Sequence, residues 1–183
     1  MHLKTLYRCL TGKLMFLKQL LAYKTRKSEK DNLSSRKSIS FKKAENVGIL
    51  FSNNDPEKNS VIDRLISELK HDGKKVKVLA FEQNTSIRHL PYDSFSRRDI
   101  NFWCKYLKPN LTNFVEREFD FLICPDDPPG ALISNVLAMS KAKCRVGRPN
   151  NQNKSTFELM ISSKDPSPNN WVASMYDYLK KIN

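Results

Sequence analysis

Glycine is scarce in this chain, with only five residues among 183. None of the five falls in G-x-G-x-x-G or G-x-x-x-x-G-K-[ST], the loops through which proteins commonly bind dinucleotides and nucleoside triphosphates. A long apolar run is also missing, because Lys13, Lys18 and Lys24 interrupt the most hydrophobic stretch. We therefore predict no cofactor and no membrane-spanning helix.

Cysteine and histidine are sparse as well, at four and three residues. No C-x-x-C pair occurs and the histidines lack the spacing of metal ligands, so we predict neither a disulfide framework nor a metal site. Cys124 and Cys144 are interpreted as buried apolar residues, since no histidine is placed to activate either thiol. The sequence therefore offers no candidate catalytic residue, which favours a protein that is not an enzyme. The scattered cysteines indicate a reducing, cytoplasmic compartment.

Negative charge is absent from the first 28 residues, and this concentrates the positive charge at the amino-terminal end. The whole chain has a formal net charge of +13. Residues 1–43 hold twelve Lys and Arg against only Glu29 and Asp31, whereas residues 44–183 hold twenty against seventeen. The sequence thus predicts a nearly neutral body with a basic leader that meets an anionic partner.

The leader has the pattern of a basic amphipathic helix over residues 1–28. Its apolar residues recur every three or four positions and form one stripe, made of Leu3, Tyr7, Leu10, Leu14, Leu17 and Leu21. Four cations fall off the stripe and are candidate anion-binding residues: Lys4, Arg8, Lys18 and Arg26. Residues 29–43 are polar and basic, which predicts a mobile linker.

Four interpretations of this helix stay open. It could lie on an anionic membrane surface, which would place the protein peripherally at the inner face of the membrane. It could bind RNA phosphates, for example on the ribosome. No DNA-specific motif occurs in the sequence. It could be a cleaved organellar presequence, or its stripe could pack on the body or on a second copy of the chain.

The body, residues 44–183, alternates short apolar strands with amphipathic helices. Strands are predicted at residues 47–51, 75–81, 119–124, 143–147 and 157–161, and helices at 61–69, 110–118, 128–139 and 171–179. Between residues 82 and 108 no clean period is present. Strands that alternate with helices predict a single α/β domain with a Rossmann-like, mostly parallel open sheet and helices on both faces.

Residues 119–147, FDFLICPDDPPGALISNVLAMSKAKCRVG, also carry a resemblance. With VGILF (47–51), GKKVKVLAF (73–81) and FELMI (157–161), this stretch resembles an uncharacterised family of small α/β proteins found in Bacteroidota, known only as a domain of unknown function. More remotely, its F-D-x-L-I, S-K-A-K and R-V-G segments are similar to the amino-terminal half of heptosyltransferase-type glycosyltransferases. That similarity implies a Rossmann-like fold, and a reduced glycosyltransferase-like domain that binds a small phosphorylated or sugar ligand is kept as an alternative function.

Two polar turns follow predicted strands, where open α/β sheets bind ligands. The first contains Asn53, Asn54 and Asp55, and the second contains Asp126 and Asp127. These carboxylates could do acid/base work or hold a cation, but we favour the alternative that the aspartates cap the helices that follow.

A basic cluster on the predicted strand 143–147 is a further candidate. Alternation places Lys143 and Arg145 on one face of this strand, where they could present charge to a phosphate. The favoured alternative is an exposed edge strand that cations protect from aggregation.

The function expected first is therefore that of a binding or scaffolding protein, attached to a membrane surface or anionic assembly by its leader. The second is a reduced glycosyltransferase-like domain that binds a small ligand at the turns around Asp55 and Asp126. The third is association with RNA or the ribosome.

Overall fold

The computed structural model describes residues 2–83, 91–101, 103–149, 156–163, 165 and 167–182, with side chains from Met15 onward. Long and short helices and six strands alternate along the chain. In order, they are α1 (His2–Asp31), η1 (Leu33–Ser35), β1 (Asn46–Ser52), α2 (Pro56–His71), β2 (Lys75–Glu82), β3 (Asp93–Ser96), η2 (Arg97–Asp99), α3 (Pro109–Glu116), β4 (Phe121–Ile123), α4 (Ala131–Met139), β5 (Cys144–Gly147), β6 (Leu159–Met160) and α5 (Pro168–Lys181).

The six strands form one parallel sheet in the order β3-β2-β1-β4-β5-β6. The centre of the sheet is β1, whose residues Val47, Ile49, Leu50 and Phe51 have no exposed surface. This burial on both faces explains the continuous apolar run that predicted a central strand. The α/β, Rossmann-like fold class is thereby confirmed.

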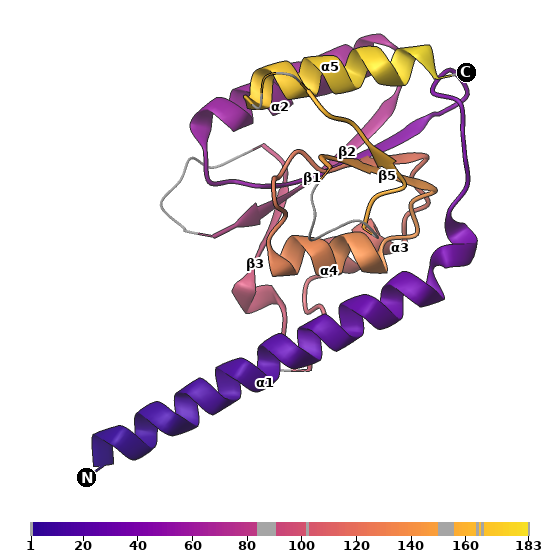
Figure 1. Cartoon of the computed structure of the whole chain (residues 1–183). Coiled ribbons are helices and arrows are strands. Elements are labelled where there is room, and N and C mark those ends of the chain that lie inside the picture. Colours follow the sequence, from indigo (N-terminus) through magenta and orange to yellow (C-terminus); the bar gives the residue numbers. More distant parts are fainter. Residues whose placement is uncertain are drawn as a thin grey trace.

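Helices cover both faces of the sheet (Figure 1). On one face, α2 and α5 pack side by side over an apolar core that includes Ile62, Leu65 and Trp171. On the other face, α3 and α4 cover a second core that includes Phe114 and Ile133. The chain crosses from one half of the sheet to the other between β3 and β4, so the strand order reverses at the β1–β4 pair.

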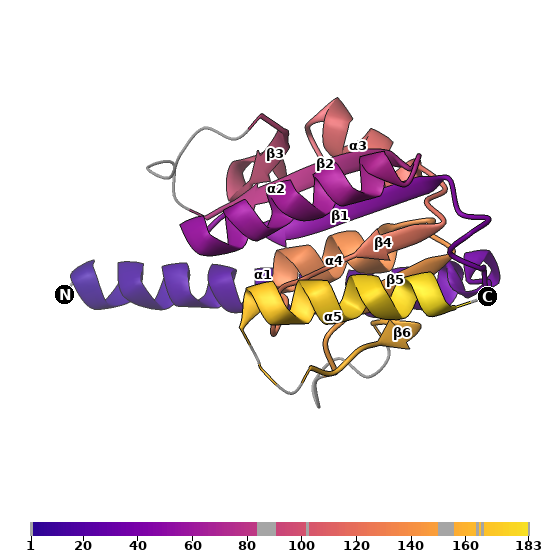
Figure 2. The same ribbon diagram turned by 90° about the horizontal axis from the view of Figure 1, so that it is seen from above.

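Helix α1 lies on the outside of α4, and the second half of its leucine stripe packs on the body. Leu17, Leu20 and Leu21 contact the core under α3 and α4. The amino-terminal part of the helix extends past the sheet (Figure 2). Of the four interpretations of the leader, packing of the stripe on the body therefore holds for the second half of α1, whose apolar residues complete the fold. Among the residues that the structure describes, no helix combines the length and the apolar character needed to cross a bilayer.

Residues 29–43, predicted as a mobile linker, are held against the body instead. Helix α1 continues to Asp31, and the Asn32 side chain donates to the carbonyl oxygens of Ala138 and Met139 at the end of α4. The backbone N–H of Lys37 donates to the Lys143 carbonyl at 3.0 Å, and Phe41 is only 3 % exposed. The polar composition of this segment concealed these contacts, because most of them use backbone groups.

Among the strands of the described residues, β3 is the one that the sequence did not predict. It pairs with β2 at the edge of the sheet, and Phe95 is its one fully buried residue among four. So short and polar a segment has no apolar period that could reveal it.

Candidate functional site

The two predicted polar turns meet at the edge of the sheet where β1 and β4 end. A cavity of about 350 Å³ lies between them, at the point where the strand order reverses. Ligands bind at this position in open α/β sheets, because the loops diverge there and leave a crevice. The lining residues are Ser52, Asn54, Asp55, Lys58, Pro125, Asp126, Asp127, Pro128, Arg148 and Pro168.

A buried ion pair between Lys58 and Asp126 forms one wall of the cavity. Lys58, in the first turn of α2, places its Nζ 2.9 Å from Asp126 Oδ1 and 2.7 Å from Asn54 Oδ1. Asp126 also accepts hydrogen bonds from the Ser52 backbone N–H, at 2.9 Å, and from the Ser52 hydroxyl, at 2.6 Å. Three protein donors thus hold the carboxylate of Asp126, so its role is to fix the two turns and to position Lys58.

Arg148 supplies a second buried cation to the same cavity. It follows β5 directly, is 8 % exposed, and its guanidinium lies 5.0 Å from the centre of the Trp171 ring. Burial lowers the pKa of Arg148, while the charge of Asp127 opposes part of this effect. A guanidinium that has lost much of its hydration gains from an anion placed beside it.

The capping interpretation holds for one of the two turns. Asp55 is the N-cap of α2 and accepts a hydrogen bond from the Glu57 backbone N–H at 2.9 Å. It is wrong for Asp126 and Asp127, because α4 begins only at Ala131 and Gly130 occupies its N-cap position without a side-chain bond. The two prolines delay the helix, which leaves Asp127 exposed at the rim of the cavity.

Asn53 is the one predicted ligand residue of these turns that does not line the cavity. It is 1 % exposed, and its Oδ1 accepts a hydrogen bond from Asn59 Nδ2 at 2.7 Å. Its backbone N–H donates to the Phe81 carbonyl, which ties the end of β1 to β2. Asn53 therefore supports the turn from beneath.

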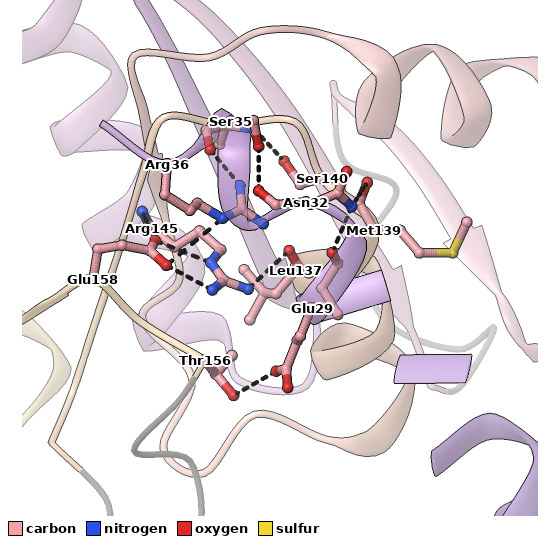
Figure 3. A network of polar contacts seen from close by, with 12 residues as sticks. Glu29, Asn32, Ser35, Arg36, Leu137, Met139, Ser140, Arg145, Thr156 and Glu158 are labelled. Carbon is pink, nitrogen blue, oxygen red and sulfur yellow. Dashed lines mark hydrogen bonds and ion pairs between the residues drawn. The ribbon is translucent and has the colours of Figure 1, made fainter. Parts of the chain in front are cut away.

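Lys143 and Arg145, the predicted phosphate-binding pair, are both held by carboxylates of the protein. Lys143 Nζ lies 2.7 Å from Asp120 Oδ1. Arg145 is buried and binds Glu158, which also lies within ion-pair distance of Arg36 (Figure 3). The edge-strand alternative is wrong too, because β5 lies between β4 and β6 and all four of its residues are buried.

The four candidate cations of the leader divide into two groups. The side chains of Lys4 and Arg8 lie outside the described residues. Lys18 and Arg26 are exposed, on a part of α1 whose opposite side packs on the body. Neither of these two lies near the cavity at the end of β1.

The cysteines behave as the sequence predicted. Cys124 has no exposed surface, and burial raises the pKa of its thiol well above the usual value. Burial also raises the pKa of Cys144 to about 12. Both thiols are protonated near neutral pH and are poor nucleophiles. In the part of the chain that the structure describes, no group of three His, Cys, Asp or Glu side chains could hold a metal ion.

Sequence reasoning missed the two buried cations of the cavity, Lys58 and Arg148. The available signal was position: Lys58 follows Asp55 by three residues in the first turn of a helix, and Arg148 comes directly after a strand. In a parallel sheet both positions fall at the carboxyl edge. Their burial could not be predicted, because it depends on the turn after β4 and on Trp171 of α5.

Comparison with models of protein families gives a match. The model of a family described as "Family of unknown function (DUF6913)" matches residues 18–182. The matched range begins within α1, directly after Leu17, one of the residues that contact the core under α3 and α4. No curated protein matches the chain.

Proposed function

The chain belongs to this family of unknown function, and from the cavity we propose that it binds a small phosphorylated sugar where β1 and β4 end. One observation carries the proposal: two cations, Lys58 and Arg148, each only 8 % exposed, line one cavity at the switch point of the sheet. Burial deprives both cations of hydration, so an anionic ligand in the cavity would interact favourably with each of them.

The cations favour a phosphate group. The Lys58 ammonium has three N–H donors, of which Asn54 and Asp126 take two. Arg148 offers a planar fork that suits phosphate oxygens. The Asp55 cap marks the positive end of the α2 dipole at the same cavity, which also favours an anion.

The carboxylates favour hydroxyl groups on the same ligand. Asp127 and Asp55 line the cavity, and carboxylate oxygens accept hydrogen bonds from hydroxyls. The volume of about 350 Å³ lies at the lower end of the range for small-molecule sites. The remote similarity of residues 119–147 to the amino-terminal half of heptosyltransferase-type glycosyltransferases supports a sugar as the hydroxyl-bearing part.

The test is calorimetric titration of the full chain with three probes: a hexose 6-phosphate, the free hexose and inorganic phosphate. We expect the hexose phosphate to bind most tightly and the free hexose least tightly. Arg148→Met should weaken binding of the hexose phosphate at least tenfold, since a charge-assisted hydrogen bond contributes about 1.5–3 kcal/mol. Asp127→Asn should weaken the hexose phosphate but not inorganic phosphate.

Lys141→Met is the matched control, because Lys141 is an exposed cation paired with Glu116 away from the cavity. Absence of binding by all three probes would refute the proposal. Binding that is equal in the wild-type chain and in Arg148→Met would also refute it. Circular dichroism of each variant separates a loss of the site from a loss of the fold.

A further inference from the structure

The outward side of α1 combines apolar side chains with cations, and no described residue of α1 lines the cavity at the end of β1. Residues at helical spacing share this side, so we define the outer face of α1 as Met15, Phe16, Gln19, Tyr23, Arg26, Lys27 and Lys30. Three of its apolar side chains are largely exposed: Met15 at 63 %, Phe16 at 49 % and Tyr23 at 64 %. The opposite side of the helix contacts α4 and the core below it.

The body carries a further exposed aromatic residue, on a segment that contacts α1. Trp103 is 62 % exposed, and its carbonyl oxygen accepts a hydrogen bond from Lys24 of α1. Trp and Tyr side chains concentrate at the level of lipid headgroups, because one part of each ring system is apolar and another forms hydrogen bonds. Exposed Trp, Tyr and Phe side chains on α1 and on the segment that contacts it are therefore typical of a surface that meets a bilayer.

The charge of the outer face is positive. Arg26, Lys27 and Lys30 lie within five residues, and among the described side chains none of the three forms an ion pair. The carboxylate of Glu29 points elsewhere, toward the Thr156 hydroxyl at 3.4 Å. Each Lys or Arg near an anionic lipid surface strengthens binding about fivefold.

We propose that the outer face of α1 docks the protein on the surface of a bilayer that contains anionic lipids. Its apolar side chains lie at positions 15–23 and its cations at positions 26–30, and helices that lie in the plane of the interface combine these two kinds of side chain. RNA is a poorer fit, since base stacking needs an array of aromatic rings, and the outer face has only Phe16 and Tyr23, seven residues apart. The place of α1 along the outside of the domain leaves this side open to a flat surface (Figures 1 and 2).

The test is co-sedimentation of the full chain with vesicles of phosphatidylcholine alone or mixed with phosphatidylglycerol. We expect binding to the mixed vesicles only, and weaker binding as salt is added. The variant Arg26→Gln/Lys27→Gln/Lys30→Gln should bind about 100-fold more weakly. The variant Phe16→Ser/Tyr23→Ser should also bind more weakly, but it should keep the salt dependence of the wild-type chain.

The matched control removes three exposed cations from other parts of the molecule, as Lys42→Gln/Lys70→Gln/Lys181→Gln. Its net charge equals that of the first variant, so a general effect of charge would weaken both equally and overturn the proposal. Failure of the wild-type chain to bind the mixed vesicles would overturn it as well. So would a shift to dimers that depends on Phe16 and Tyr23, or binding to RNA in place of vesicles, because either result assigns the face to another partner.

Discussion

Arg145 and Glu158 form a bidentate ion pair, with Nη2 2.6 Å from Oε1 and Nε 3.0 Å from Oε2. The Glu158 carboxylate also accepts a hydrogen bond from the Arg145 backbone N–H and lies 3.6 Å from Arg36 Nε. Burial and the charge of Arg145 lower the pKa of Arg36 to about 10, although Glu158 opposes this. One carboxylate therefore holds two guanidinium groups and links the segment after α1 to β5.

We expect Glu158→Gln to lower the free energy of unfolding by about 3 kcal/mol, because it removes the carboxylate that two buried guanidinium groups share. Urea denaturation at pH 7 measures this change. Glu116→Gln is the control, since it removes an exposed partner of Lys141 and should cost less than about 1 kcal/mol. Equal effects of the two substitutions would show that the cluster around Glu158 adds nothing to stability.

The carboxyl group of Asp120 is expected to make the stability of the fold depend on pH. Its burial raises the pKa of the carboxyl, but hydrogen bonds from the Asn46 and Glu45 backbone N–H groups and from Lys143 outweigh this, so the net pKa is lowered. A lowered pKa in the folded state means that the stabilisation is present above the unfolded pKa of about 3.9 and is lost as pH falls through the folded pKa.

We therefore expect the stability of the wild-type chain to fall as the pH drops below about 4. Asp120→Asn should lower the free energy of unfolding by about 2 kcal/mol at pH 7, because its amide cannot accept all the hydrogen bonds of the carboxylate. The stability of this variant should fall less steeply in acid, because an amide does not titrate. Urea midpoints at pH 7, 5 and 3 give both quantities. Asp63→Asn, at an exposed position of α2, should keep the wild-type profile.

The strands and helices of the central body followed from the sequence, because apolar runs and helical spacing depend on neighbours along the chain. The β1 and β5 strands and the helix of Val61, Ile62 and Leu65 are examples. The turn residues Asn54, Asp55, Asp126 and Asp127 were likewise placed at one edge by the alternation of strand and helix.

Contacts between distant segments could not be predicted in the same way. Arg145 and Glu158 are 13 residues apart, and only the parallel pairing of β5 with β6 brings them together. The sequence could not decide which surface α1 contacts, because a leucine stripe fits a lipid surface, a second copy and the body equally well. Which of these surfaces contacts Leu17 and Leu21 depends on the shape of α4 and its surroundings.

Gly147 offers a test of packing between β5 and the chain that precedes β6. A Cβ atom added there would lie 2.3 Å from Cζ of Phe157, so Gly147→Ala should lower stability by about 1–3 kcal/mol through overpacking. Calorimetric melting compares it with Gly130→Ala, where a Cβ atom meets no neighbour within 4 Å. Phe157→Leu in the Gly147→Ala background should recover part of the loss; a loss that does not depend on residue 157 would contradict the steric cause.

Two successive hydrogen bonds connect Tyr106, α4 and α1. Tyr106 Oη donates to Asn135 Oδ1 at 2.8 Å, and Asn135 Nδ2 donates to the Thr25 hydroxyl at 3.0 Å. Asn135 has no exposed surface, so Thr25→Val leaves its buried amide without this acceptor. We expect a loss of about 1–3 kcal/mol.

Thr25→Ser retains the hydroxyl and should stay within about 0.5 kcal/mol of the wild-type chain. Hydrogen exchange followed by mass spectrometry should show faster exchange for residues 17–31 of α1 in Thr25→Val, and no change in β1. If the second half of α1 exchanges as fast in the wild-type chain as in Thr25→Val, the helix is not fastened to the body by this contact. The leucine stripe would then be available to a partner after all.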